Sequence, residues 1–416
     1  MKAQSYQMHT YSKFRQYLDL LSDAGDNVVP LSVGYPEPGE FPLPNNVLSA
    51  LSVCKDGKEK VRPGYGWASG TSELREALAL FENKIHNTNY TKENVCMVAG
   101  ATYGFNRISE YLFRDMFDSR DTLMIVAPTY YYMLNRVNQY AKTVSVVGTV
   151  ENNFQITVEQ IVAAIDSNTK AVFIANPTNP TYLYYSNEFF ERLIPILLEK
   201  NIYLIIDESG DAFYCDENHN RFYRYSSVFN SDNVIRIVTA SKKYLMAEYR
   251  IGYVLASKKF MGDKLKGFIN NVGDDIGNAP LSANEALMEI VNCELSLLSG
   301  QKNEKLTLYE SSLIENNKKM LHLKQLCIDY LKKCSNVKKI IYPDSNFNVT
   351  FSIFDLSNHE DINLYKLILD KANVSVLPCS GLGIDSKLLF FRISYAVEQS
   401  KLEQGMSQLC SFLESI

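Results

Sequence analysis

Lys242 and Arg250 stand eight residues apart in a largely apolar stretch, residues 239–253. The run at 233–238 and the run at 250–255 are rich in apolar and β-branched residues, which is typical of buried strands. Lys242 is therefore predicted to lie on a turn between two core strands. Because lysine is rarely buried without a partner, its amine is either an ordinary solvated group or one held at the edge of a core for chemistry.

Small or polar residues also follow other predicted strands, in four segments: Ala99–Gly104, Pro128–Tyr132, Asn176–Thr181 and Asp207–Gly210. Each segment alone is a weak signal, since a small-residue turn is usually only a turn and an aromatic triplet is usually packing. Exposed backbone N–H groups at the start of the helix after Gly100 favour a phosphate. Together with Lys242, the segments supply a phosphate cradle, an aromatic face, an amide and a carboxylate. A phosphorylated pyridine aldehyde needs that set of groups.

The elements that carry these groups predict a parallel sheet. Strands are predicted at 95–98, 122–127, 143–148, 171–175, 202–206, 233–238 and 250–255, and helices at 103–117, 130–140, 157–165 and 187–199. Such alternation is typical of an α/β fold with a mostly parallel seven-stranded sheet covered on both faces. In such a sheet the ligand binds at the carboxyl ends of the strands, where the candidate groups follow.

The two ends of the chain predict a second, smaller α+β domain. A helix at 280–299 and a long amphipathic helix near 306–330 are followed by strands near 337–342, 347–353, 374–377 and 388–394. Close to the N-terminus, the bare backbone of Gly34 could approach a ligand. We expect a large domain at 46–290 and a discontinuous small domain, 1–45 plus 291–416, that closes on the substrate.

Composition limits the class of protein. The chain has 416 residues, 46% of them hydrophobic, which is enough for two cores. Its net charge is −5 and it has no basic run, so we expect no nucleic-acid partner. No apolar run approaches a membrane span and the N-terminus lacks a signal-peptide pattern, which predicts a cytoplasmic protein. The eight cysteines form no Cys-x-x-Cys pair, which predicts reduced thiols and no metal site.

A series of motifs extends along nearly the whole chain. In order they are Gly34-Tyr-Pro-Glu-Pro, Tyr65-x-x-x-x-Gly70-x-x-x-Leu-Arg75, Gly100-Ala-Thr, Pro128-Thr-Tyr130, Asn176-Pro-Thr-Asn179-Pro-Thr, Asp207-Glu, Ser241-Lys242 with Arg250-Ile-Gly252-Tyr, and Phe391-Arg-Ile-Ser-Tyr395. In this order the chain resembles the class I/II aminotransferases, the fold type I enzymes that use pyridoxal 5′-phosphate (PLP). The resemblance implies a homodimeric enzyme of amino acid metabolism that moves an amino group between an L-amino acid and a 2-oxo acid.

The resemblance also implies roles around the cofactor ring. Lys242 would form the internal aldimine, a Schiff base with PLP, and would then move the α-proton of the substrate. Lys243 is the rival, and Lys242 is preferred because only it has the family spacing to Ser241 and Arg250. The resemblance implies that Asp207 pairs with the pyridine nitrogen and that Tyr130 stacks on the ring. It also implies that Asn179 forms a hydrogen bond with the phenolic oxygen O3′.

Phosphate and substrate roles follow in the same way. The resemblance implies a phosphate site made of backbone N–H groups, hydroxyls and a guanidinium, contributed by Ala101, Thr102, Thr239, Ser241 and Arg250. Tyr65 would reach the phosphate of the other subunit, so the homodimer would share its active sites. Arg392 would bind the substrate α-carboxylate, with Asn179 nearby, and Gly34 would offer backbone to the same substrate.

Three positions depart from the pattern of the family: Gly210, Tyr182 and Glu248, the last of which is a glycine in many relatives. Relatives usually carry a tyrosine where this chain has Gly210, so one donor to O3′ is missing, and Tyr214 is a candidate substitute. The usual glycine after the Asn-Pro motif is Tyr182. Gly210 opens an alternative in which the same Cα deprotonation ends in elimination, cyclisation or oxidation of the side chain. A cofactor-binding regulatory domain without turnover is a third hypothesis, and the chain lacks the basic N-terminal DNA-binding segment that it requires.

Overall fold

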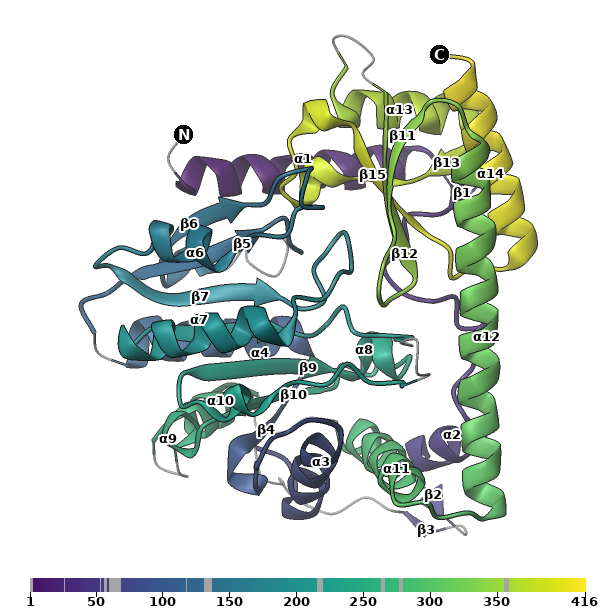
Figure 1. Cartoon of the computed structure of the whole chain (residues 1–416). Helices are drawn as coiled ribbons and strands as arrows, with labels where there is room; N and C mark the ends of the chain where they lie inside the picture. Colours follow the sequence, from purple (N-terminus) through teal and green to yellow (C-terminus); the bar gives the residue numbers. More distant parts are fainter. Residues whose placement is uncertain are drawn as a thin grey trace.

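The computed structural model of the chain describes residues 3–25, 27–52, 54–55, 58–59, 69–116, 118–130, 137–214, 220–262, 266–276, 280–354 and 359–416. The described elements form two packed bodies connected by one long helix (Figure 1). Tyr65 and residues 131–136 of the helix predicted at 130–140 lie outside the described residues.

The lower body in Figure 1 is built on a seven-stranded sheet with the order β4-β10-β9-β8-β7-β5-β6. Its strands are β4 Val95–Val98, β5 Thr122–Ala127, β6 Lys142–Val147, β7 Thr169–Ala175, β8 Tyr203–Asp207, β9 Val234–Thr239 and β10 Gly252–Ala256. The strands from β6 to β9 in this order are parallel, and β10 is antiparallel to both of its neighbours. The predicted mostly parallel seven-stranded sheet is confirmed.

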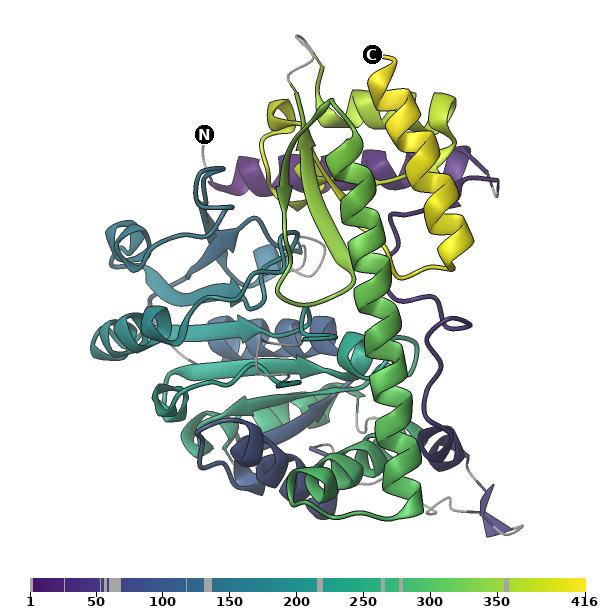
Figure 2. The same ribbon diagram turned by 45° about the vertical axis from the view of Figure 1, so that its right-hand side comes forward.

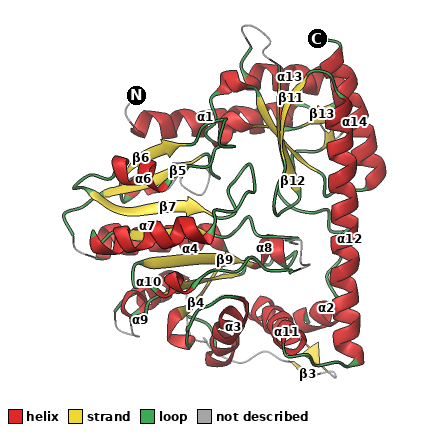
Figure 3. Ribbon diagram, viewed as in Figure 1, coloured by secondary structure: helices red, strands yellow, loops and turns green. Residues whose placement is uncertain are grey.

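Helices cover both faces of this sheet (Figure 3) because its central strands are apolar on both sides. Ile205 of β8 shares a core with Phe105 of α4, Ala101–Glu110. The next residue, Ile206, shares a different core with residues of α6, Val158–Ala164, and α7, Asn187–Glu199. Successive strand side chains point to opposite faces, so each strand contributes to two cores.

The other helices of the lower body lie at its periphery: α2 Asn45–Leu51, α3 Ser72–Ile85, α8 Ala240–Lys243, α9 Lys258–Met261, α10 Phe268–Ile276 and α11 Leu281–Leu298. A short hairpin consists of β2 Cys54–Lys55 and β3 Lys58–Glu59. The helix predicted at 103–117 is α4 followed by a π-helical turn, Tyr111–Asp115. Thr71 caps α3, since its hydroxyl accepts a 3.2 Å hydrogen bond from the Leu74 N–H.

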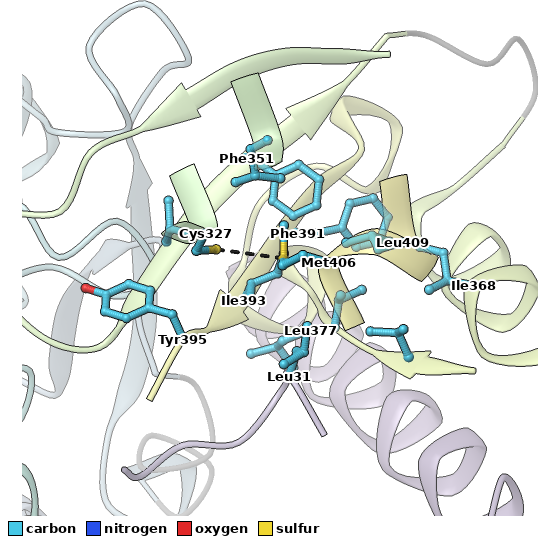
Figure 4. Packing of buried hydrophobic residues seen from close by; sticks show 14 of the residues in the cluster. Leu31, Cys327, Phe351, Ile368, Leu377, Phe391, Ile393, Tyr395, Met406 and Leu409 are labelled. Atoms are coloured by element: carbon cyan, nitrogen blue, oxygen red, sulfur yellow. Dashed lines mark hydrogen bonds between the residues drawn. The ribbon is translucent and has the colours of Figure 1, made fainter. Parts of the chain in front are cut away.

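The upper body has a four-stranded sheet in the order β11-β12-β15-β14, beside a parallel pair of β1 and β13. Its elements are α1 Ala3–Asp23, β1 Val29–Pro30, β11 Val337–Ile341, β12 Asn348–Ile353, α13 Asp361–Ala372, β13 Val374–Ser375, β14 Leu377–Pro378, β15 Phe390–Ser394 and α14 Gln399–Glu414. Figure 4 shows Leu31, Leu377 and Met406 in the core of this body. Both ends of the chain therefore build one core.

The helix α12, Glu304–Lys333, extends along both bodies (Figures 1 and 2). Leu306 and Tyr309 near its start belong to a core of the lower body, whereas Met320 and Cys327 belong to the core of the upper body. One rigid helix thus fixes the spacing of the two bodies. The division into 46–290 and 1–45 plus 291–416 stays a prediction, and Leu306 and Tyr309, which it assigns to the small domain, lie in a core of the lower body.

Three further features concern the described residues only. No helix among them is long and apolar enough to cross a membrane. Their His, Cys, Asp and Glu side chains form no group of three or more that could hold a metal ion. Six cysteines among them are free thiols: Cys96, Cys293, Cys327, Cys334, Cys379 and Cys410.

Candidate active site

A cavity of about 250 Å³ opens at the carboxyl ends of β7, β8 and β9, where residues of both bodies meet. It is lined by apolar, polar and charged residues: Gly34, Ala101, Thr102, Tyr130, Ala175, Pro177, Asn179, Tyr182, Asp207, Ser209, Gly210, Thr239, Ser241, Lys242, Arg250, Asn346 and Arg392. Apart from Tyr214, every residue given a cofactor or substrate role from the sequence is in this lining except Tyr65, which lies outside the described residues. A parallel sheet brings these distant segments together because its strands end at one edge.

A larger cavity, about 520 Å³, lies between α11, α12 and the segment that follows β8. Its lining is mostly apolar, and two of its cations form ion pairs. The Arg221 guanidinium donates to Glu294 at 2.7 Å, and the Lys243 amine donates to Asp211 at 2.6 Å. Convergence of titratable groups, rather than size, therefore identifies the smaller cavity as the candidate site.

Lys242 lies in the short helix α8 rather than on the turn predicted between two strands. Thr239 caps this helix, since its hydroxyl accepts a 3.2 Å hydrogen bond from the Ser241 N–H. Burial lowers the pKa of the Lys242 amine; Asp207 opposes this shift, while Arg250 and Arg392 add to it. The amine of Lys243 lines the larger cavity, so the two adjacent lysines serve different sites.

Asp207 is the last residue of β8 and is 4% exposed. Its Oδ1 accepts hydrogen bonds from the Ser209 N–H at 3.0 Å and from the Ser209 hydroxyl at 2.5 Å. Burial raises the pKa of this carboxyl group, and the Ser209 bonds and the Lys242 charge oppose that rise. Because both bonds go to Oδ1, Oδ2 is left for a cationic or N–H donor of a ligand.

An anion cradle forms where α4 begins. Gly100 has φ = 83°, a left-handed conformation that favours glycine. A Cβ atom at Gly100 would lie 2.7 Å from Nη2 of Arg250, so the guanidinium packs directly over bare backbone. The N–H groups of Ala101 and Thr102 belong to the first turn of α4 and have no partner within the helix. Cationic, N–H and hydroxyl donors together suit a phosphate.

Arg392 comes from β15, which lies between β12 and β14. The residue is 6% exposed, and its Nη1 donates to the Tyr182 hydroxyl at 3.1 Å and to Asn179 Oδ1 at 3.3 Å. Its buried Nε has no hydrogen-bond partner among the described residues, and no carboxylate there forms an ion pair with it. A buried guanidinium with an unsatisfied donor calls for an anionic ligand.

Three further polar residues of the lining were not among the sequence candidates: Tyr182, Ser209 and Asn346. Ser209 had a signal, because serine two residues after an aspartate commonly bonds its carboxylate. Tyr182 had been noted only as a departure from the family pattern, and Asn346 had no signal. Tyr214, the suggested substitute for a tyrosine at position 210, lies in the lining of the larger cavity instead.

Comparisons with known proteins agree with this geometry. A family model described as aminotransferase class I and II matches residues 26–409. An aspartate aminotransferase of Thermotoga maritima is 24% identical over 394 residues, which cover 94% of this chain and 93% of the relative. An aspartate aminotransferase of Bacillus subtilis is 25% identical over 397 residues, covering 95% and 93%.

Solved structures share the fold over nearly the whole chain. The structure of an aspartate aminotransferase from Thermotoga maritima has a TM-score of 0.77 at 21% identity and covers 96% of each chain. An aromatic aminotransferase from Pyrococcus horikoshii has a TM-score of 0.76 at 21% identity, covering 96% of this chain and 99% of the other. These likenesses establish fold type I for this chain.

Proposed function

Since the chain belongs to the aminotransferase class I and II family and is an enzyme of that family, we propose that PLP is its cofactor and Lys242 its point of covalent attachment. The reaction moves the amino group between an L-amino acid and a 2-oxo acid. The observation that carries the proposal is the burial of the Lys242 amine and the Asp207 carboxyl group in one cavity. Few environments other than a catalytic site bury two such groups beside an anion cradle.

The residues present fit the cofactor. The cradle at Gly100, where Arg250 packs against bare backbone, supports phosphate binding by Ala101, Thr102, Thr239, Ser241 and Arg250. Asp207 has a free Oδ2 for the protonated ring nitrogen, and Tyr130 and Asn179 supply a ring contact and an amide. When bound, PLP acts as an electron sink that stabilises the negative charge left when the substrate Cα loses its proton.

Lys242 is the proposed base for that proton. Burial lowers the pKa of its amine, so a larger fraction is unprotonated near neutral pH than for a solvated lysine. Asp207 opposes the shift and limits it. We expect the amine to take the proton from Cα of the amino acid and to hold it until it is delivered to the cofactor.

Arg392 is the proposed partner of the substrate α-carboxylate, a group that both the amino acid and the 2-oxo acid carry. Its unsatisfied Nε and its position beside Asn179 support bidentate binding. Gly34, in the loop after β1, would contribute backbone from the upper body to the same substrate. Because the amino acid and the 2-oxo acid would both bind Arg392 through their carboxylate, they would bind one after the other.

A homodimer with shared active sites and a cytoplasmic location complete the proposal, with no nucleic-acid or membrane partner. The dimer rests on the role proposed for Tyr65. That role requires two chains, because Tyr65 would reach the phosphate of the other subunit.

Replacement of Lys242 by Ala tests the function. We expect the purified variant to lose the visible absorbance of the covalently bound cofactor and at least about a thousandfold in turnover, because the amine is both attachment point and base. Lys243→Ala is the matched control and should keep both properties. The wild-type enzyme, given an amino acid, should accumulate the pyridoxamine form of the cofactor. Ammonia or a cyclised product without that form would instead favour the elimination or cyclisation alternative.

A further inference from the structure

Two departures from the family pattern, Tyr182 and Gly210, lie against each other in the cavity. A Cβ atom at Gly210 would lie 3.0 Å from the Pro177 carbonyl oxygen and 3.4 Å from Cδ1 of Tyr182, and the second distance is an ordinary van der Waals contact. The Tyr182 ring therefore borders the space into which a side chain at position 210 would extend. Where relatives place a tyrosine at the end of β8, this chain has a tyrosine ring that comes from the segment after β7.

The backbone of Tyr182 has an unusual conformation. Its φ is 56°, a left-handed value that is costly for a residue with a Cβ, and its side chain is 4% exposed. Its N–H donates to the Thr178 carbonyl at 2.7 Å, and its own carbonyl accepts from the Asp344 N–H at 3.1 Å. Contacts from both bodies therefore fix the backbone of Tyr182, and the strain is consistent with a functional constraint.

The hydroxyl of Tyr182 contacts Arg392, the residue proposed to bind the substrate carboxylate. It accepts a 3.1 Å hydrogen bond from Arg392 Nη1, so its own hydrogen remains available to donate. Burial raises the pKa of this phenol, and the charge of Arg392 opposes that rise. A neutral hydroxyl beside a guanidinium with an unsatisfied Nε forms a donor set suited to a carboxylate.

We propose that Tyr182 is a substrate-binding and specificity-determining residue that donates a hydrogen bond to the carboxylate held by Arg392. Its ring fills the space beside Gly210 and thereby limits the width of the cavity for the substrate. This inference rests on the proposed function through the carboxylate role of Arg392.

Binding of propionate to the PLP-loaded enzyme, measured by titration calorimetry, tests the hydrogen bond proposed for the Tyr182 hydroxyl. Propionate carries a carboxylate but no amino group, so it binds without reacting. We expect Tyr182→Phe to raise the Kd for propionate about tenfold, as loss of one hydrogen bond to a charged group predicts. Tyr184→Phe is the matched control, because the Tyr184 hydroxyl bonds Asp211 at 2.7 Å and is outside the cavity lining. Its Kd should stay within about twofold of the wild-type value.

Arg392→Gln distinguishes a failure of the inference about Tyr182 from a failure of the carboxylate role proposed for Arg392. Loss of propionate binding in Arg392→Gln together with an unchanged Kd in Tyr182→Phe overturns the inference and leaves the proposed function standing. Unchanged binding in Arg392→Gln overturns the carboxylate role of Arg392 and the inference with it.

The fit between the side chains at positions 182 and 210 is tested separately by thermal unfolding. Gly210→Tyr should lower the thermal midpoint more in the wild-type background than in Tyr182→Gly, because removal of the Tyr182 ring, 3.4 Å from a Cβ atom at position 210, leaves room for the new side chain beyond its Cβ. Additive effects of the two substitutions would show that the Tyr182 ring does not limit the space at position 210.

Discussion

At the scale of single residues, the cavity holds two groups of opposite charge, Asp207 and Lys242. Burial shifts the pKa of each group toward its neutral form, and each group opposes the shift of the other. Ser209 favours the charged form of Asp207 through two hydrogen bonds to one oxygen. The ionisation of the carboxyl group thus depends on Ser209, which does not titrate itself.

Ser209→Ala should therefore alter the pH dependence of the reaction. The Ser209 hydroxyl lowers the pKa of Asp207, so its removal raises that pKa, and the carboxylate is lost at a higher pH as acid is added. We expect the acidic limb of the kcat/KM profile to move to higher pH and its plateau to fall about tenfold.

Ser400→Ala is a suitable control for this prediction, because the Ser400 hydroxyl also bonds a carboxylate, Glu398, at 2.5 Å, but on the exposed surface. Its pH profile should match the wild-type profile. A Ser209→Ala profile that also superimposes on the wild type would show that the hydroxyl does not tune Asp207.

At the scale of elements, strands β8 and β9 carry the site on one side and a buried ionic cluster on the other. Arg236 of β9 is fully buried and donates to Glu208 at 2.5 Å and to Glu82 of α3 at 2.7 Å. Glu208 directly follows Asp207, so the cluster fixes the end of β8 where the cofactor carboxylate lies. The charge of Arg236 is strongly favoured, because its two acidic partners raise its pKa further despite burial.

Arg236→Met should destabilise the fold by about 3–5 kcal/mol, because it leaves two buried carboxylates without their cation. The free energy of unfolding, measured by urea denaturation, is the test. Arg192→Met is the matched control: the Arg192 pair with Glu159 is exposed, so its loss should cost about 1 kcal/mol or less. Equal losses in the two variants would show that the cluster does not anchor β8.

At the scale of the whole molecule, α12 connects a core of each body, and the cavity lies between them. The upper body supplies Gly34, Asn346 and Arg392, whereas the lower body supplies Lys242 and the anion cradle. Asn346 also donates a 2.7 Å hydrogen bond to the Gly210 carbonyl, which links the bodies at the site. Relative motion of the bodies would therefore alter substrate contacts while leaving the cradle intact.

Complementation between subunits tests the proposed homodimer. Lys242→Ala and Tyr65→Ala should each lose most of their activity, because one lacks its attachment lysine and the other a phosphate contact. After the two variants are unfolded together and refolded, a mixed dimer has one intact site, so random assortment should restore about one quarter of wild-type activity. No recovery, with light scattering showing dimers, would exclude a shared site.

Much of the fold could be predicted because strand and helix periodicity is local. Predicted strands such as 95–98 and 122–127 coincide with β4 and β5, and the order of motifs indicated the family before any contact was known. Element ends were less accurate: the helix predicted to start at 103 begins at Ala101, and a short helix replaces the turn at Lys242. Ends depend on caps and packing more than on periodicity.

The sequence by itself determined the family, the chemistry of the groups and their order, since these depend on residue types and spacing along the chain. Only the tertiary structure decided which neighbours face the cavity. Lys242 and Lys243 are adjacent and chemically identical, yet they line different cavities; Tyr182 rather than Tyr214 lies beside Gly210. The reason is physical: side-chain direction and distant packing follow from contacts between segments far apart in sequence, such as that of Arg392 with Tyr182.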